Sequence, residues 1–266
     1  MHAQLPSTTA ENVSVATPCT CVHCGHRFVA AAQNGHRVVV GDCTKEEAVT
    51  AALGQRRPAL CLTDPPWGIG ATASPKNKYD QYVDTVENLQ ALIDGFLPLA
   101  RAVAKVVVVT SGNRNQRRYP EPTWTLAWVT GPHAGSGPWG FCSWQPILCY
   151  GKDPKLANRK GRHPDAFVHK ERSEKNGHPC PKPIKFWGEL MKRTSEPGDT
   201  IFEPFLGSGT ALIAAEETGR SVCAIEISPA YVDLSVGRWE AFTGRRAFHE
   251  KTGEPFSVCR DPAVKE

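Results

Sequence analysis

The chemically most informative residues of this chain are Asp64-Pro65-Pro66-Trp67, which follow the apolar run Ala59–Thr63. Both prolines fix φ and lack a backbone N–H, so a strand has to stop there. The four residues therefore form a rigid rim at the end of the strand. This rim has a carboxylate, backbone carbonyls without a hydrogen-bond partner in the sheet, and a flat aromatic face. Such groups suit a planar exocyclic amine, because they accept its two N–H hydrogens and stack on its ring. A proline-terminated strand with a buried Trp is the structural alternative.

A second informative turn reads Phe202-Glu203-Pro204-Phe205-Leu206-Gly207-Ser208-Gly209-Thr210, between a strand pattern and a helix pattern. Its glycines let the backbone approach a ligand, and the helix N-terminus supplies unpaired N–H groups. The turn lacks the Lys of a phosphate-binding loop and the third spaced Gly of a dinucleotide fingerprint. Glu203 would repel a pyrophosphate, and Glu226 ends the next strand, where doubly wound folds bind ribose hydroxyls. S-adenosylmethionine, a cationic nucleoside without phosphate, fits this pair; a turn that serves only tight packing is the alternative.

The elements that would position these residues alternate along the chain from His36 onward. Short apolar runs, typical of buried strands, are separated by longer segments with helical periodicity, which predicts a doubly wound α/β sheet covered on both faces. Thr44 is a candidate N-cap, with Glu47 three residues later. Strands are expected at Arg37–Val40, Ala59–Thr63, Lys105–Val109, Thr123–Thr130, Gln145–Tyr150, Thr200–Pro204 and Ser221–Ile227, and helices at Thr44–Val49, Glu87–Ala104, Ile184–Thr194, Thr210–Thr218 and Pro229–Phe242.

The two motifs, in this order, resemble the S-adenosylmethionine-dependent DNA amino-methyltransferases of the permuted (beta) order, whose catalytic motif precedes the cofactor motif. Asp64–Trp67 is similar to the catalytic motif, Glu203–Thr210 to the cofactor loop and Glu226 to the ribose-binding acid. The resemblance covers 35–245. It implies a Rossmann-like, circularly permuted methyltransferase fold whose mostly parallel, seven-stranded sheet has one antiparallel edge strand. Trp67, Glu203 and Cys180-Pro181 depart from the commoner Tyr or Phe, Asp, and Thr followed by Gln or Glu.

The resemblance also implies a reaction, which is direct transfer of a methyl group to the exocyclic nitrogen of a base flipped out of the duplex. Asp64 and the Pro65 carbonyl would accept the amine hydrogens, beside Pro66, and Trp67 would stack on the base. The implied cofactor-binding residues are Asp42, Cys43, Asp64, Lys182, Phe202, Glu203, Pro204, Phe205, Gly207, Ser208, Gly209, Thr210, Glu226 and Ile227.

The identity of the base rests on one residue. An Asp at the head of the motif is more typical of adenine methylation and Ser of cytosine methylation, so we expect transfer to N6 of adenine in DNA. Transfer to N4 of cytosine is the alternative. An RNA adenine methyltransferase, a small-molecule methyltransferase and a non-catalytic DNA-binding module also remain open.

Positive charge is concentrated in one segment, although the net charge of the chain is only +4. Between Lys152 and Arg193 there are twelve basic and five acidic residues, a local excess that suggests contact with a polyanion. A solvated loop is the alternative. We expect DNA contacts from the loop after the first motif and from a basic insert at 151–180, through Lys76, Lys78, Arg159, Lys160, Arg162, Lys170 and Arg172.

The first 34 residues carry no sustained period, and we expect a flexible tail ahead of a catalytic domain at 35–266. Within this tail, a cysteine cluster with a single Cys-x2-Cys knuckle is interpreted as mobile reduced thiols, and a structural zinc site is the alternative. Several of the ten cysteines fall in strand patterns, and no apolar stretch approaches a membrane span, so we expect a cytoplasmic protein. A homodimer and a restriction partner are left open. The candidate zinc ligands are Cys19, Cys21, Cys24 and His26.

Overall fold

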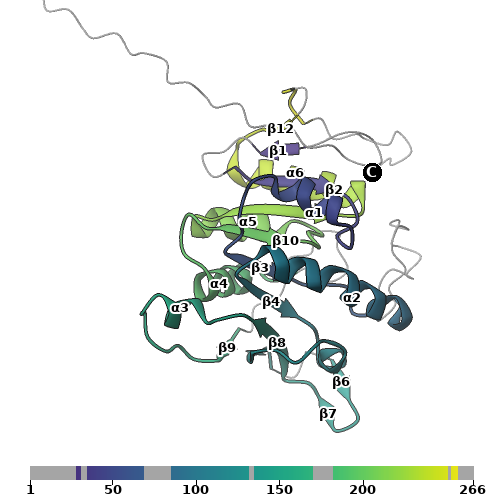
Figure 1. The fold of residues 1–266 in the computed structure, drawn as a ribbon, viewed down its shortest axis with the longest axis vertical. Helices are drawn as coiled ribbons and strands as arrows, with labels where there is room; N and C mark the ends of the chain where they lie inside the picture. Colours follow the sequence, from purple (N-terminus) through teal and green to yellow (C-terminus); the bar gives the residue numbers. More distant parts are fainter. Residues whose placement is uncertain are drawn as a thin grey trace, which may run out of the picture.

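A computed structural model of the chain describes residues 28–30, 35–68, 85–131, 135–169, 182–250 and 253–256. Within these residues a ten-stranded sheet has the order β12-β1-β2-β11-β10-β3-β4-β8-β5-β9, and helices lie on both of its faces (Figure 1). Its strands are β1 (Phe28–Ala30), β2 (Arg37–Val40), β3 (Leu60–Thr63), β4 (Val106–Thr110), β5 (Trp124–Val129), β8 (Trp144–Tyr150), β9 (Ala166–Val168), β10 (Thr200–Glu203), β11 (Ser221–Glu226) and β12 (Ala247–His249).

The centre of the sheet is parallel, as the sequence predicts. Strands β2, β11, β10, β3 and β4 run side by side in one direction, and β5 shares that direction because both β4 and β5 pair antiparallel with β8. The α/β class with a mostly parallel sheet is therefore confirmed. The expected antiparallel edge strand is corrected in position, since β8 lies inside the sheet between β4 and β5. Strands β1, β12 and β9 widen the seven-stranded core to ten.

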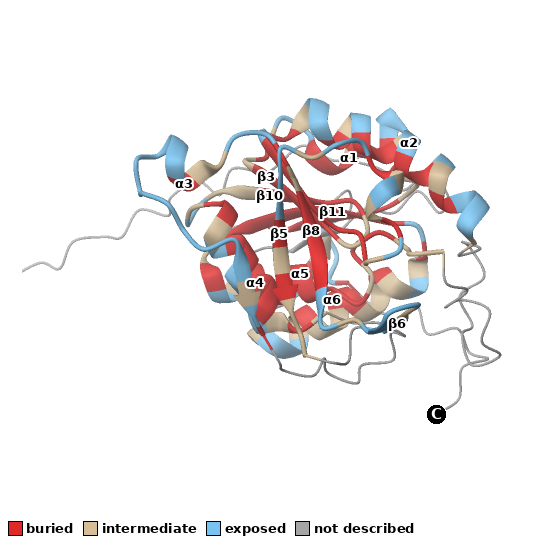
Figure 2. Cartoon of the chain, turned by 90° about the horizontal axis from the view of Figure 1, so that it is seen from below, coloured by how far each residue is buried: buried red, intermediate tan, exposed pale blue. Residues whose placement is uncertain are grey.

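The helices form two layers, one against each face of the sheet (Figure 2). Successive residues of a strand point to opposite faces. Val38 and Val40 accordingly belong to one apolar cluster, and Val39 belongs to the other. The first cluster includes residues of α4 (Ile184–Thr194), α5 (Thr210–Thr218) and α6 (Pro229–Thr243), and the second includes residues of α1 (Glu46–Leu53) and α2 (Val86–Val103).

The remaining elements are short: the 3-10 helix η2 (Gln116–Arg118), the helical turn α3 (Pro154–Ala157), and a separate hairpin of β6 (Ser136–Gly137) and β7 (Gly140–Phe141). No helix in the described part of the chain is long and apolar enough to cross a membrane. The cysteines that the structure describes are free thiols at positions 43, 61, 142, 149 and 223.

The start of α1 differs from the predicted capping box. The helix begins at Glu46, and the N-cap position is taken by Lys45, which makes no side-chain cap. Thr44 is held instead by Asp42, whose Oδ1 accepts hydrogen bonds from the Thr44 amide at 2.9 Å and from its hydroxyl at 2.7 Å. This local turn is a common competitor of helix capping for Asp and Thr side chains, so the expectation that Thr44 caps the helix is wrong.

A buried polar network ties the layer that contains α5 and α6 to the start of β2 and to β11. The ring of His36 is 0% exposed, and its Nδ1 accepts a hydrogen bond from the Val222 amide at 3.0 Å. The ring proton therefore lies on Nε2, which is 2.9 Å from Glu216 Oε1. The same oxygen accepts a hydrogen bond from Trp239 Nε1 at 2.9 Å and pairs with Arg245. The hydrogen bond from His36 is the main cause that lowers the pKa of Glu216 to about 2.

Replacing Glu216 by Gln should lower the free energy of unfolding by about 1–3 kcal/mol at neutral pH, because the network loses its only acceptor charge. Glu217 is exposed on the same helix, so Glu217→Gln makes the same chemical change outside the network. Because the pKa of Glu216 falls from 4.5 to about 2 on folding, its contribution is complete above about pH 4.5 and is lost as pH falls toward 2. Urea unfolding of the two variants across this range checks the prediction, and equal stability losses at neutral pH would contradict it.

Candidate active site

Both predicted motifs lie where five neighbouring parallel strands have their carboxyl ends. This end of the sheet is called its carboxyl edge. From one side to the other, β2 leads into Asp42, β11 ends at Glu226, β10 ends at Glu203, β3 leads into Asp64 and β4 ends at Thr110. Open α/β sheets bind their ligands at the carboxyl ends of the strands. The structure thus brings together acids that are as much as 184 positions apart in the sequence.

The carboxylate of Asp64 is held from two sides. Its Oδ1 accepts a hydrogen bond from the Thr110 hydroxyl at 2.5 Å, and its Oδ2 forms an ion pair with Lys182. The side chain of Asp64 remains 21% exposed, and that of Lys182 is 10% exposed. An ionised carboxylate offers about four lone-pair sites, so about two remain for a further ligand. The position of the carboxylate is thus fixed while part of its accepting capacity stays open.

The aromatic ring of Trp67 is half-buried beside this carboxylate, so the alternative of a fully buried core Trp does not hold. Its Nε1 donates to the Thr110 carbonyl at 3.3 Å, and its own carbonyl accepts a hydrogen bond from Asn115 at 2.7 Å. The Lys182 ammonium lies 4.7 Å from the ring centroid. Gly112 has φ of +68°, and a Cβ there would lie 3.1 Å from two ring atoms. The loop after β4 therefore fixes the ring.

These partners, at the end of β4 and on the loop after it, are site residues that the two motifs alone do not predict. Thr110, Gly112 and Asn115 lie 43 or more positions after Trp67, outside any local motif. The available signal was the polar run Thr110-Ser111-Gly112-Asn113 directly after a strand of valines. Because β4 is the parallel neighbour of β3, a polar end there has to face the end of β3.

Glu203 is an internal acid in this structure. Its side chain is 2% exposed, and Oε1 accepts hydrogen bonds from the Thr63 hydroxyl at 2.5 Å and from the Phe205 amide at 3.0 Å. Burial raises the pKa of Glu203 well above its usual range, and the nearby charge of Asp64 adds to the rise. Thr63 directly precedes Asp64. Through its hydrogen bond to Thr63, Glu203 therefore connects the glycine-rich turn to the start of the rim at Asp64.

Glu226 organises the glycine-rich turn. One of its carboxylate oxygens accepts a hydrogen bond from the Gly207 amide at 2.8 Å, and the other accepts one from the Ser228 amide at 2.9 Å. Burial raises the pKa of Glu226. At Gly209, φ is +83° and a Cβ would lie 2.7 Å from the Cβ of Ser235 on α6. Tight packing is therefore one role of this turn, and it leaves the start of α5 close to α6.

The other predicted cofactor residues occupy different environments. Ile227 is 38% exposed at the carboxyl edge, whereas Phe202 is buried in the core beneath α1 and α2. Phe205 packs edge-on against Phe96 of α2, with ring centroids 4.9 Å apart. Cys43 is buried, and burial raises the pKa of its thiol. Pro204, Ser208 and Thr210 are buried within the turn.

One hydrogen bond joins the glycine-rich turn to the rim. The hydroxyl of Thr210, the first residue of α5, is 3.4 Å from the Lys182 carbonyl, to which it donates. The side chain of Lys182 pairs with Asp64. Lys182 therefore contacts both predicted motifs, from a third segment of the chain.

Of the basic residues expected to contact DNA, the three that the structure describes do not share this edge. Strand β8 runs antiparallel, so its end returns to the opposite edge, where a Cβ on Gly151 would lie 2.7 Å from the carbonyl of Lys105. The segment that follows carries Arg159, Lys160 and Arg162 and lies beside α3, on the far side of the sheet from the hairpin (Figure 1). Lys160 also pairs with Glu196 at 2.7 Å. All three are exposed, but the structure separates them from Asp64.

Several predicted site residues lie outside the described part of the chain, so their placement stays a prediction. They are Lys76, Lys78, Lys170, Arg172 and the candidate zinc ligands Cys19, Cys21, Cys24 and His26. Among the residues that the structure does describe, no group of three or more His, Cys, Asp or Glu side chains is placed to hold a metal ion.

Curated relatives match parts of the chain. A segment of 68 residues is 40% identical to the type II methyltransferase M.ScaI of Streptomyces caespitosus and covers 26% of this chain. A segment of 115 residues is 25% identical to the type II methyltransferase M.HpaI of Haemophilus parainfluenzae and covers 41% of this chain. The matched segments span 22% and 37% of those relatives' own lengths.

Solved structures share the fold over most of the chain. A crystal structure of the M1.HpyAVI–SAM complex superposes with a TM-score of 0.53 at 18% identity, covering 76% of this chain and 97% of that one. The PvuII DNA methyltransferase, described as cytosine-N4-specific, superposes with a TM-score of 0.50 at 16% identity, covering 77% of this chain and 86% of that one. At such identities the likeness shows the fold alone.

The family itself is shown by the sequence. A family model described as DNA methylase matches residues 102–237, which is just over half of the 266 residues. The matched range includes β4 with its loop, Lys182, the glycine-rich turn and Glu226, and so most of the edge described above. The chain belongs to the DNA methylase family.

Proposed function

We propose that this protein transfers a methyl group from S-adenosylmethionine to the exocyclic N6 of adenine in DNA. The observation that carries the proposal is the rim of β3. There, a partly exposed carboxylate, Asp64, is fixed by Thr110 beside the half-buried ring of Trp67. The neighbouring strands β10 and β11 present the glycine-rich turn and Glu226 at the same edge. Membership of the DNA methylase family supports the same reaction class.

The residues at the ends of β2, β10 and β11 fit the proposed methyl donor. Asp42 and Glu226 place carboxylates at the ends of adjacent strands, where hydroxyls of a ribose can donate to them. Ile227 offers an exposed apolar side chain next to them for a purine ring. The turn before α5 contains no lysine that would favour a phosphate. S-adenosylmethionine, when bound, supplies an electrophilic methyl group on a sulfonium centre.

The rim residues would orient the amine. The exocyclic nitrogen of adenine is a poor nucleophile, because its lone pair is delocalised into the ring. Asp64 and the Pro65 carbonyl would accept its two hydrogens, which directs the lone pair toward the methyl group. As the N–C bond forms, the methyl–sulfur bond would break and leave a neutral thioether, and Asp64 would take the proton that the nitrogen releases. Trp67 would stack on the extruded base.

The most direct test of this function is to incubate the protein with labelled cofactor and unmodified DNA and then to digest the DNA to nucleosides. We expect the label in N6-methyl-2′-deoxyadenosine. Label in N4-methylcytosine would instead support the alternative base, and the absence of labelled nucleoside from a protein that binds the cofactor would refute the DNA substrate.

Replacing Asp64 by Ala should reduce methyl transfer by at least about 100-fold, because the amine loses its charged acceptor. Cofactor affinity, measured by titration calorimetry, should fall far less than turnover, because the hydrogen bonds of Glu203 and Glu226 that hold the glycine-rich turn remain in the variant. Asp94 is exposed on α2, so Asp94→Ala is the control that should keep full turnover. Turnover retained by Asp64→Ala would remove Asp64 from the mechanism.

Replacing Glu226 by Gln should weaken cofactor binding by about 10-fold or more. The glutamine amide has a single oxygen, so either the Gly207 or the Ser228 backbone N–H loses its acceptor and remains buried, at about 1–3 kcal/mol. Calorimetric titration of the variant, with Glu217→Gln as its matched control, measures the change. Unchanged affinity would show that Glu226 does not organise the cofactor turn.

A further inference from the structure

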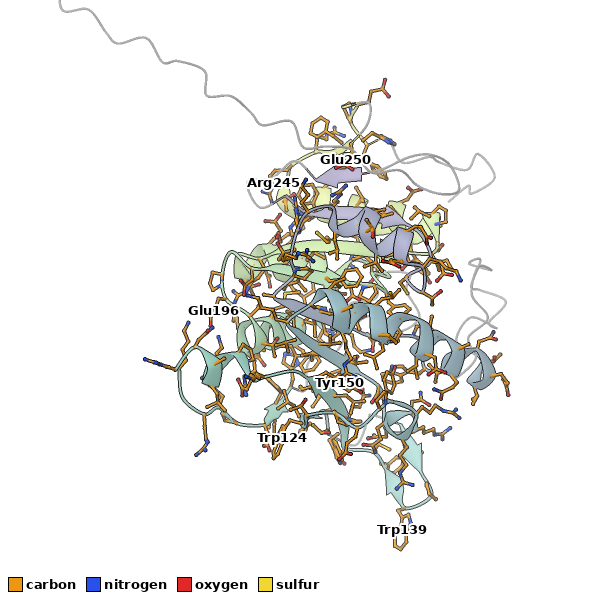
Figure 3. The ribbon with its side chains drawn as sticks, viewed as in Figure 1. Trp124, Trp139, Tyr150, Glu196, Arg245 and Glu250 are labelled. Carbon is orange, nitrogen blue, oxygen red and sulfur yellow. The ribbon has the colours of Figure 1, made fainter. Side chains whose placement is uncertain are left out.

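The β6–β7 hairpin carries the most exposed aromatic side chains of the described residues. Trp139 is 101% exposed and Phe141 is 74% exposed. Figure 3 shows Trp139 at the far tip of the hairpin, pointing away from the body of the molecule. Aromatic rings gain free energy when they leave water, so two of them on one projecting turn mark a contact surface.

The hairpin projects from the same edge of the sheet as the proposed catalytic rim. It connects β5 to β8, and the last residue of β5, Val129, pairs with Trp144 at the start of β8. Strand β5 has the same direction as β4, so its carboxyl end lies at the edge where β4 ends in Thr110. The aromatic tip therefore extends from the side on which Asp64 is presented.

The loop after β4 anchors the hairpin to the rim. Asn113 donates to the Trp144 carbonyl at 2.7 Å, and Arg114 donates to the Ser136 carbonyl at 3.2 Å. The next residue, Asn115, donates to the Trp67 carbonyl at 2.7 Å. Three consecutive side chains thus contact the base of the hairpin and Trp67. These contacts fix the position of the hairpin relative to Trp67.

The charge around the hairpin suits a nucleic acid. From Thr123 to Gln145 the chain contains no Asp, Glu, Lys or Arg, so nothing on the hairpin repels phosphate. Arg114, which contacts the base of the hairpin through Ser136, is exposed, and Arg117 is exposed three residues later on η2. Exposed aromatic rings next to arginines form the combination that stacks on bases while the backbone phosphates are neutralised.

We propose that the β6–β7 hairpin is a DNA-contacting element whose tip, Trp139 with Phe141, stacks on bases of the duplex next to the extruded target base. The proposal rests on the proposed function, since it takes DNA as the substrate. Apolar side chains inserted between base steps hold a duplex open and offset the loss of stacking that extrusion causes. The hairpin would thereby stabilise the opened duplex, while the rim of β3 positions the amine.

The test compares Trp139→Ala with Trp124→Ala. Trp124 is also exposed, at 61%, but it begins β5 and so lies at the opposite edge of the sheet. Binding is measured by fluorescence anisotropy with two short duplexes, one fully paired and one with a single unpaired adenine. Equal cofactor affinities of the two variants and the unaltered protein would establish that all three are folded.

We expect Trp139→Ala to weaken binding of the duplex with the unpaired adenine by about 10-fold, within the range for loss of one stacked base, and Trp124→Ala to leave it unchanged. The salt dependence of binding should not change, because no phosphate contact is removed. Equal affinities of the two variants would overturn the hairpin proposal. So would a Trp139→Ala protein that dissociates from a dimer to a monomer with unaltered DNA affinity, because the tip would then bind a second copy of the chain.

Failure of the hairpin proposal can be told apart from failure of the proposed function. If the unaltered protein methylates DNA and Trp139→Ala matches Trp124→Ala in binding, only the hairpin assignment is wrong. If the unaltered protein binds neither duplex and labels no nucleoside, DNA is not the substrate and both proposals are wrong.

Discussion

The ion pair and hydrogen bond that hold the Asp64 carboxylate are the interactions on which the candidate site depends. Thr110 reaches Asp64 from the neighbouring strand, and Lys182 reaches it from the segment before α4. Lys182 also accepts a hydrogen bond through its carbonyl from Thr210, at the start of the helix that follows the glycine-rich turn. Lys182 therefore links the rim to the glycine-rich turn. A ligand that moves Lys182 would change the positions of both.

Glu203 and Glu226, at the ends of β10 and β11, hold the backbone of the glycine-rich turn. The sequence alone suggests a direct contact with the ligand. Glu203 and Glu226 are both buried, and each accepts a backbone N–H of the glycine-rich turn. Burial raises the pKa of both groups. With Asp64 they form a row of carboxyl groups along three adjacent strands. Burial favours the uncharged forms of Glu203 and Glu226, and Lys182 pairs with Asp64, so the row positions the turn and the rim rather than supplying a net negative field.

Hydrophobic periodicity predicted most elements, and α4 and α5 have their predicted bounds. Periodicity reports burial but not strand direction, so it could not place the antiparallel β8 inside the sheet. For the same reason it could not show that Arg159 and its neighbours return to the edge opposite Asp64. The role of Thr110 was hidden by its 46-residue separation from Asp64. The aromatic hairpin was missed because a short glycine-rich turn has no period.

The central claim is that the rim of β3 holds the amine of an adenine extruded from DNA. It is tested most directly by the structure of the protein bound to a methylatable duplex and the demethylated cofactor product. We expect adenine N6 to lie within about 2.6–3.2 Å of an Asp64 carboxylate oxygen and of the Pro65 carbonyl, with the base stacked on Trp67. An adenine that remains paired in the duplex, or an amine bound away from Asp64, would contradict it.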